Sequence, residues 1–237
     1  MITGSGVPRR LLMTTVLVLA GTLLVAAPAH ADWSRPVVLS RGDWAHNDPL
    51  VDVDAQGDAM VAWQRNNKAF EPESHRILLT KRTRAGRWSE TRIVTPRGTD
   101  AYLEGMAVDA DGDAVVTWNA DSILYARRVR RDLSMGRIKQ ISVSGTLGIN
   151  TALAVDDAGN ALFTWNASTN AAQRQPHARR WAVGGRLGPE LYLPDTPGVA
   201  ADAAPQPALT PDGRGIVSWG DDQSAYARRY GPADGWG

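Results

Sequence analysis

Four copies of one sequence pattern constrain the fold of this 237-residue chain more than any other feature. In each copy a short apolar segment leads into a turn with glycine, and a second apolar segment follows that ends in tryptophan. The copies read PLVDVDAQGDAMVAWQ, GMAVDADGDAVVTWN, ALAVDDAGNALFTWN and PALTPDGRGIVSWG, with their tryptophans at Trp63, Trp118, Trp165 and Trp219. The spacing of about 50 residues is typical of propellers and other repeat arrays.

Each repeat predicts four short antiparallel strands. The Asp or Asn and the Gly between the first two apolar segments are the residues that a tight hairpin requires. A second hairpin follows, with an alternating segment such as YARR, a turn containing glycine, and a last segment such as GRWSETRIV. Beyond residue 31 the chain lacks the 3.6-residue periodicity of an amphipathic helix. The repeats therefore predict an all-β fold, a β-propeller of about four blades with four antiparallel strands each.

The two ends of the chain predict how the ring of blades closes. The last repeat stops at Trp236 and Gly237, where a fourth strand is due, and the segment 33–39 matches the missing strand. We therefore expect the N-terminal strand to pair into the last blade, which would remove the exposed strand edges. The expected blades are about 41–95, 96–143, 144–194, and 195–237 together with 32–40. The alternative is half a propeller that a second copy of the chain completes.

Residues 1–31 are typical of an export signal. They contain Arg9 and Arg10, then an apolar run, and then the small residues Ala29 and Ala31 before the expected cleavage point. The apolar run has about 17 residues, the short limit for a membrane span. We expect this signal peptide to be removed, leaving a secreted or extracytoplasmic propeller domain, 32–237, with no stable membrane insertion.

The composition narrows the chemistry. There is no cysteine, which excludes disulfides and thiolate catalysis. A formal net charge of +1 gives no electrostatic reason to expect a nucleic-acid partner. The sequence contains no phosphate-binding loop, nucleophile elbow or HExxH pair, so we expect no cofactor and no metal. We expect a monomer, or a dimer if the ring is incomplete.

The acidic cluster DADGD is interpreted as a turn. Asp109, Asp111 and Asp113 have the spacing of the first three ligands of a calcium loop, but Ala114 and Ala120 replace the glycine and the glutamate that such a loop needs. The four repeats share the glycine rather than the acids, as a hairpin turn demands.

These repeats resemble those of secreted bacterial β-propellers labelled sialidase-like or BNR-like, on the motifs AVDADGDAVVTW, YARR and GRWS and over nearly all of the chain after the signal. The resemblance implies the propeller fold. A sialidase would use three arginines, an acid and a Tyr/Glu pair, whereas here the arginine pairs 127–128, 179–180 and 228–229 recur at one repeat position, as residues placed for the fold do. The pattern DxxGxAxxxW also departs from the Asp-box SxDxGxTW, so no residue is assigned as catalytic.

Residues that break the repeat are the candidates for binding a ligand, because binding sites on rigid scaffolds come mostly from loops. The connections between blades contain Trp44, His46, Asp48, Tyr102, Glu104, Asn150, Asp202 and Gln206. In a propeller these connections lie on one face around the channel, where the side chains can converge. An aromatic ring beside a carboxylate suits sugar stacking with hydrogen bonds to hydroxyl groups.

Three functions remain open from the sequence. The first is an exported, non-enzymatic propeller that recognises a glycan or protein ligand through these connections. The second is a carboxylate-dependent glycoside hydrolase or lyase, which would need two carboxyl groups, such as those of Glu104 and Asp202, facing each other across the channel. The third is a structural interaction platform of the cell envelope, for which an apolar patch would be the sign.

Overall fold

The computed structural model describes residues 34–41, 44–67, 75–143, 147–168, 174–194, 204–221, 223–232 and 235–237. The chain divides into two compact units, Met1–Val37 and Val38–Gly237. In the first unit the described residues 34–37 form neither helix nor strand, and the predicted signal peptide lies outside the described residues. Within the described ranges, the structure contains no helix with the length and apolar character to cross a membrane.

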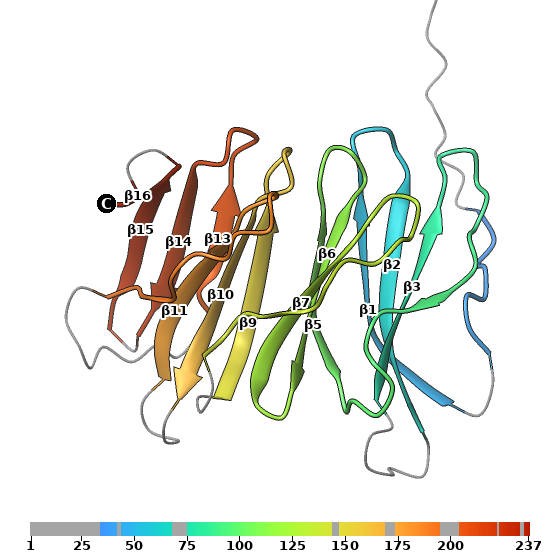
Figure 1. The fold of residues 1–237 in the computed structure, drawn as a ribbon, viewed down its shortest axis with the longest axis horizontal. Coiled ribbons are helices and arrows are strands. Elements are labelled where there is room, and N and C mark those ends of the chain that lie inside the picture. Colours follow the sequence, from blue (N-terminus) through green and yellow to red (C-terminus); the bar gives the residue numbers. More distant parts are fainter. Residues whose placement is uncertain are drawn as a thin grey trace, which may run out of the picture. The chain divides into compact units, whose positions relative to one another are not determined.

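The second unit consists of four antiparallel sheets, each of four strands in chain order (Figure 1). Sheet 1 contains β1 (Trp44–Val53), β2 (Ala59–Asn67), β3 (Arg76–Arg82) and β4 (Arg92–Ile93). Sheet 2 contains β5 (Tyr102–Val108), β6 (Ala114–Ala120), β7 (Ile123–Val129) and β8 (Lys139–Gln140). Sheet 3 contains β9 (Leu147–Val155), β10 (Ala161–Ser168), β11 (Arg174–Trp181) and β12 (Leu191–Tyr192). Sheet 4 contains β13 (Gln206–Leu209), β14 (Gly215–Gly220), β15 (Ala225–Gly231) and β16 (Gly235–Trp236). The predicted all-β architecture of four four-stranded blades is confirmed.

The first hairpin of each sheet turns at the glycine that the repeats share. Gly57, Gly112, Gly159 and Gly213 all have φ angles between 81° and 87°, a region that side-chain-bearing residues rarely adopt. In sheet 2, one carboxylate oxygen of Asp109 accepts the N–H groups of Asp111 and Asp113 at 3.0 and 2.9 Å. The acidic cluster thus shapes the turn, as the sequence predicts.

The hydrophobic core lies between neighbouring sheets. Along the second strand of sheets 2 and 3, one residue faces the following sheet and its neighbours face the preceding one, whereas Met60 of sheet 1 faces sheet 2 and Val217 of sheet 4 faces sheet 3. Three buried clusters follow from this alternation: Met60 with Val116 and Trp118, Val115 with Phe163 and Trp165, and Leu162 with Val217 and Trp219. Three of the four repeated tryptophans, Trp118, Trp165 and Trp219, therefore fill the spaces between sheets, whereas Trp63 lies on the outer face of sheet 1.

Arginines of the YARR pattern join each sheet to the preceding one. The Nη1 atoms of Arg127, Arg179 and Arg228 donate hydrogen bonds of 2.7, 2.6 and 2.8 Å to the backbone oxygens of Val94, Ile141 and Leu193. These arginines occupy one repeat position, as the sequence indicates. Sheet 1 carries Thr80 there, since Thr80 pairs with Val61 as Arg127 pairs with Val116.

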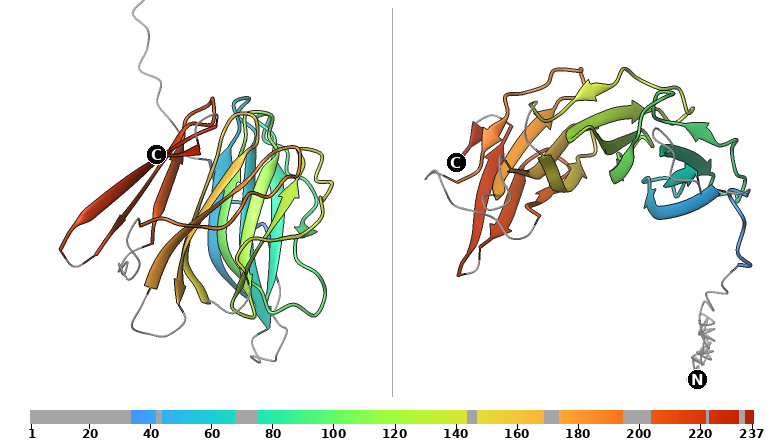
Figure 2. Two further views of the ribbon diagram at one scale, coloured as in Figure 1. Left: turned by 60° about the vertical axis from the view of Figure 1, so that its left-hand side comes forward. Right: turned by 90° about the horizontal axis from the view of Figure 1, so that it is seen from below.

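The prediction that an N-terminal strand closes the ring is wrong. The fourth strand of sheet 4 is β16, whose Trp236 pairs with Tyr230, and residues 34–41 form no strand. Leu39 instead lies beside Val61 and Trp63 on the outer face of sheet 1. The first strands contact one another in the order β1, β5, β9, β13, and Figure 2 shows sheets 1 and 4 at opposite ends of a curved row.

Candidate functional site

Three of the predicted site residues lie at β-bulges in the first strands of consecutive sheets. The pairing of β1 with β2 is interrupted around Asp48, that of β5 with β6 at Glu104, and that of β9 with β10 around Asn150. Asp48 and Asn150 have positive φ angles of 52° and 53°. A bulge redirects the side chain of the extra residue and is common beside functional sites.

Near these bulges, the side chains of Tyr102, Asp100 and His75 contact one another, and we call these three residues the Tyr102 cluster. Tyr102 is the first residue of β5, Asp100 lies two residues before it, and His75 directly precedes β3 of sheet 1. His75 Nδ1 donates to Asp100 Oδ1 at 2.5 Å, and the Tyr102 hydroxyl donates to Asp100 Oδ2 at 3.2 Å. The His75 and Tyr102 rings lie 4.5 Å apart between centroids, with 33° between their planes.

Two members of the cluster, Asp100 and Tyr102, influence each other's ionisation. Burial works to raise the pKa of Asp100, but the hydrogen bonds from His75 and Tyr102 outweigh it and hold the pKa below its ordinary value. Burial and the charge of Asp100 raise the pKa of Tyr102. At neutral pH Asp100 is therefore a carboxylate and Tyr102 a neutral phenol that donates to it.

Both ring nitrogens of His75 are engaged within the protein. Nδ1 faces Asp100, and Nε2 lies 3.2 Å from the side-chain amide nitrogen of Asn66. With Nδ1 protonated toward Asp100, a neutral ring accepts at Nε2 from Asn66. This arrangement orients the ring beneath Tyr102 and leaves neither nitrogen directed at a ligand.

Glu104 lies two residues after Tyr102, on the side of β5 that reaches sheet 3. Its Oε2 accepts a hydrogen bond of 2.9 Å from the Thr151 hydroxyl of β9. Burial raises the pKa of the Glu104 carboxyl, and the Thr151 hydrogen bond opposes that rise in part. β5 thus carries the exposed ring of Tyr102 and a largely buried carboxyl group two residues apart.

The other predicted residues do not join this cluster. His46 lies on β1 in a pocket on the outer face of sheet 1, with Pro49 and Trp63. Gln206 is exposed at the start of β13, where its amide donates to the Ala204 oxygen. Trp44 begins β1, but its side chain, like all of Asp202, lies outside the described residues.

The sequence prediction missed His75 and Asp100. Neither residue belongs to a motif with characteristic spacing. Asp100 stands in the connection TDAYLEG from which Tyr102 and Glu104 were selected, and its position two residues before Tyr102 was the available signal. His75 enters the site because the two segments are joined by hydrogen bonds, from the Ala101 N–H to the His75 oxygen at 3.2 Å and from the His75 N–H to Asp100 Oδ1 at 3.2 Å.

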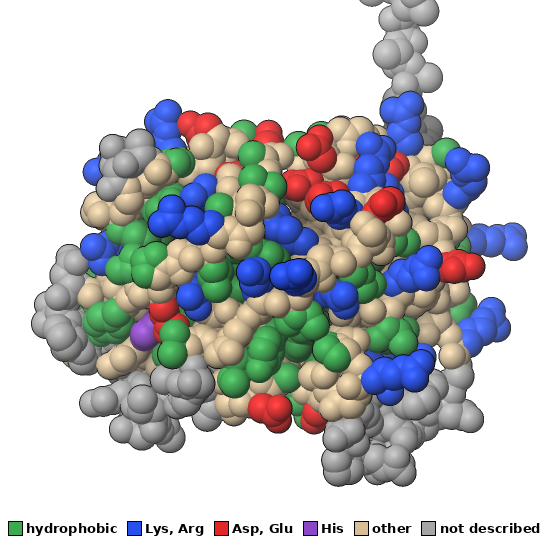
Figure 3. Space-filling model, viewed as in Figure 1, with side chains coloured by type: hydrophobic (Ala, Val, Ile, Leu, Met, Phe, Trp, Pro, Cys, Tyr) green, Lys and Arg blue, Asp and Glu red, His purple; other side chains and the backbone are tan. Residues whose placement is uncertain are grey.

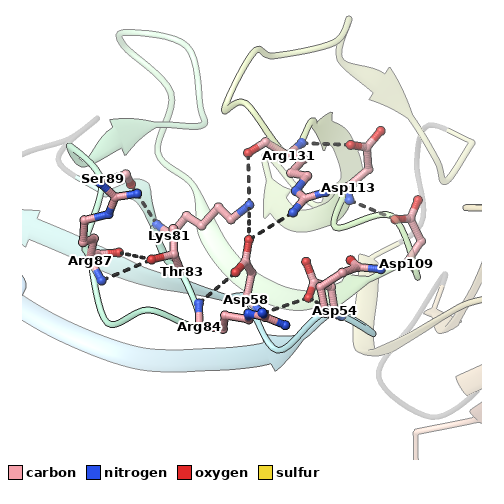
Figure 4. Close-up of polar contacts among 11 residues, drawn as sticks. Asp54, Asp58, Lys81, Thr83, Arg84, Arg87, Ser89, Asp109, Asp113 and Arg131 are labelled. Carbon is pink, nitrogen blue, oxygen red and sulfur yellow. Dashed lines mark hydrogen bonds and ion pairs between the residues drawn. The ribbon is translucent and has the colours of Figure 1, made fainter.

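A second polar cluster joins sheets 1 and 2 at their hairpin turns (Figure 4). Asp58 lies 2.9 Å from Lys81 Nζ and 3.5 Å from Arg131 Nη2, and accepts the N–H of Arg84 at 2.8 Å. Its carboxylate is saturated by protein donors, which indicates a role in the fold. Among the described residues, no group of three or more His, Asp or Glu side chains has an arrangement that could hold a metal ion.

Comparison with known proteins finds a likeness in fold. No family model and no curated protein matches the chain. A solved protein of unknown function from Dyadobacter fermentans is 15% identical, with a TM-score of 0.53 over 85% of this chain and 71% of that one. An endo-arabinase from Bacteroides thetaiotaomicron is 16% identical, with a TM-score of 0.48 over 79% and 75% of the two chains.

The chain is shorter than many of the structures it resembles. It covers 61% of a protein of unknown function from Bacteroides caccae, with 16% identity and a TM-score of 0.49 over 86% of this chain. At such identities the likeness shows the fold alone.

Proposed function

We propose that this protein is an exported β-propeller that binds a glycan at Tyr102 and Glu104 without cleaving it. The observation that carries the proposal is the Tyr102 ring, which is 45% exposed and yet fixed in orientation by Asp100 and His75. An exposed aromatic ring held in this way loses little conformational freedom when a ligand stacks on it.

The chemistry of the site favours a sugar. The C–H face of a pyranose packs on an aromatic ring, while its hydroxyl groups need donors and acceptors nearby. Glu104 supplies oxygen atoms on the same strand, and its contact with Thr151 positions the carboxyl group. Recognition without catalysis fits the engagement of both His75 ring nitrogens, since neither is positioned to take a proton from a substrate.

The test is binding of the full chain to a panel of neutral and acidic polysaccharides, measured by calorimetry. We expect Tyr102→Ala to weaken binding at least tenfold and Tyr102→Phe to weaken it less, because the phenyl ring keeps the stacking surface. The matched control is Tyr226→Ala. Tyr226 is 37% exposed, and its hydroxyl likewise donates to an aspartate, Asp221, at 2.9 Å, but its ring stacks on Trp219 rather than on a histidine.

Equal losses for Tyr102→Ala and Tyr226→Ala, or no binding to any polysaccharide, would overturn the proposal. A glycoside hydrolase or lyase is the second candidate, because burial raises the pKa of Glu104 in the direction that a general acid needs. Prolonged incubation of the bound polysaccharide distinguishes the two functions. New reducing ends that disappear with Glu104→Gln would show catalysis.

A further inference from the structure

A pocket of about 300 Å³ lies between the outer strands of sheets 3 and 4. Sheet 3 contributes Arg180 of β11, Arg186 and Leu191, and sheet 4 contributes Tyr230 of β15 and Trp236 of β16. None of these residues belongs to the Tyr102 cluster. A volume near 300 Å³ is the lower end for small-molecule sites and accommodates one ring-sized group.

Between sheets 2 and 3, the arginine at the repeat position of Arg180 is bound by the protein itself. There Arg128, the counterpart of Arg180, donates to the backbone oxygens of Gly159 and Trp181 at 2.5 and 3.3 Å. Its guanidinium carbon lies 4.5 Å from the centroid of the Trp181 ring. The protein itself therefore supplies acceptors for both Nη atoms of Arg128.

Arg180 has no such backbone partners among the described residues. Its guanidinium carbon lies 5.6 Å from the centroid of the Tyr230 ring, farther than in the Arg128 contact, and the pocket lies beside it. A guanidinium group has five N–H donors, and a partly buried one left without acceptors favours an anionic oxygen ligand. Arg180 is partly buried, so it meets this condition.

The walls of the pocket combine positive charge with aromatic surface. Among the described residues, the charged side chains that line the pocket are Arg180 and Arg186, and none of its described lining residues is a carboxylate. The Tyr230 and Trp236 rings lie 5.1 Å apart between centroids on the opposite wall. Figure 3 shows basic and hydrophobic side chains side by side where Figure 1 places sheets 3 and 4. Arg186 and Pro189 are exposed, so the pocket is open to solvent.

We propose that this pocket binds an acidic saccharide, with the carboxylate of one uronic acid residue at Arg180 and Arg186 and its ring against Trp236 and Tyr230. Arginine pairs with a carboxylate through parallel N–H···O hydrogen bonds. An aromatic wall accepts the apolar face of the sugar ring. The neutral counterpart of the same sugar lacks the charged group, and it should bind much more weakly.

The experiment is calorimetric titration of the full chain with a galacturonate disaccharide, a neutral galactose disaccharide, and inorganic sulfate. We expect the galacturonate to bind at least tenfold more tightly than either of the other two. Arg180→Gln and Arg186→Gln should each weaken galacturonate binding at least tenfold. Arg186 is an exposed turn residue, so its variant tests the site without disturbing the packing of the sheets.

The matched control is Arg229→Gln. Arg229 occupies the Arg180 position in sheet 4, where it is exposed and lies outside this pocket. We expect the affinity of Arg229→Gln for galacturonate to stay within twofold of that of the parent protein. Sulfate binding as tight as galacturonate binding would reduce the pocket to a general anion site and overturn the saccharide assignment. Galacturonate binding that survives both arginine variants but is lost in Tyr102→Ala would place the acidic sugar at the Tyr102 cluster instead.

Discussion

Asp58 joins sheets 1 and 2 through its charge. Its side chain and that of Lys81 are 9% and 10% exposed, and their charged atoms lie 2.9 Å apart. Hydrogen bonds from Lys81 and from the backbone of Arg84, together with the charge of Arg131, lower the pKa of Asp58 from 3.8 to about 2. An aspartate with a lowered pKa stabilises the folded state only while it is ionised.

Replacing Asp58 by Asn should therefore destabilise the protein in a pH-dependent way. Above the unfolded-state pKa of 3.8 the full stabilising effect of the carboxylate is present, and it is lost as the pH falls from about 4 through about 2. Urea unfolding of the parent and Asp58→Asn at several pH values should show a difference at pH 7 that closes across this window. Asp157→Asn, at an exposed turn position of sheet 3, is the control, with a smaller difference. A constant difference for Asp58→Asn down to pH 2 would contradict the role of the charge.

At single-residue scale the sequence identifies only part of the candidate site. Tyr102 and Glu104 stand out because they interrupt the repeat. His75 does not, because its role depends on the packing of sheet 2 against the start of β3, which no local pattern encodes. Whether these side chains bind a ligand stays a prediction.

The hairpin turns show how each element depends on its neighbour. Gly57 and Gly112 occupy the same turn position, with φ angles of 83° and 87°. A Cβ atom added at Gly112 would lie 2.6 Å from Asp54 Oδ2 in sheet 1, whereas one at Gly57 would lie 3.6 Å from its nearest neighbour, Arg84 Cβ. The turn of sheet 2 therefore fits closely against sheet 1.

Alanine at the two glycines should separate the cost of the turn from the cost of this close fit. Gly57→Ala carries the strain of a left-handed residue, about 1–2 kcal/mol. Gly112→Ala carries that strain and also displaces the buried Asp54 carboxylate, and overpacking of this kind costs a further 1–3 kcal/mol, roughly. Chemical denaturation of both variants measures the difference. Equal losses of unfolding free energy in the two variants would show that the Asp54 side chain moves aside without destabilising the protein.

The elements themselves could be predicted because their signals are local. Asp and Gly at the turns, together with alternating residues on both sides, determine a hairpin within about fifteen residues. The bulge at Glu104 could not be predicted in this way. It depends on how β5 lies between Gln64 of sheet 1, which accepts the Leu103 N–H at 3.1 Å, and Thr151 of sheet 3.

Within Val38–Gly237, the side chain that faces the following sheet is buried in sheets 1 and 3 but exposed in sheet 4, beside which no further sheet is described. Leu162 is fully buried where it faces sheet 4, and Met60 is 2% exposed where it faces sheet 2. Ile216, at the same position in sheet 4, is 44% exposed. In a repeat array each unit gains stability from its neighbours, so a unit with one neighbour is less stable than a unit with two.

We therefore expect sheet 4 to open before sheet 3. Amide hydrogen exchange followed by mass spectrometry should show faster exchange in β14 than in β10, although both are central strands of their sheets. A repeat with one neighbour opens more readily than a repeat with two when the interfaces between repeats supply much of the free energy of folding. Equal protection of β14 and β10 would show that the array unfolds as one cooperative unit.

The number of sheets could be predicted from the sequence, but the segment that forms the fourth strand of sheet 4 could not. Counting repeats gives four sheets of four strands, as observed. The same count left sheet 4 one strand short because it expected a longer fourth strand, whereas β16, like β4, β8 and β12, is only two residues long. The pairing of Trp236 with Tyr230 supplies that strand from the same hairpin.

The arginine contacts between sheets have a consequence for how such a chain can lengthen in evolution. In the third repeat, Arg179 donates a hydrogen bond to the preceding repeat and Asp156 lies against the turn of the following repeat. A duplicated copy of the third repeat would therefore carry the side chains for the junctions on both of its sides. A copy of the first repeat placed internally would offer Thr80 in place of the arginine. A copy of the last would offer Thr210, which occupies the turn position of Asp54 and Asp156. The interior repeats thus carry the groups for both junctions, whereas the first repeat lacks the arginine and the last repeat lacks the aspartate.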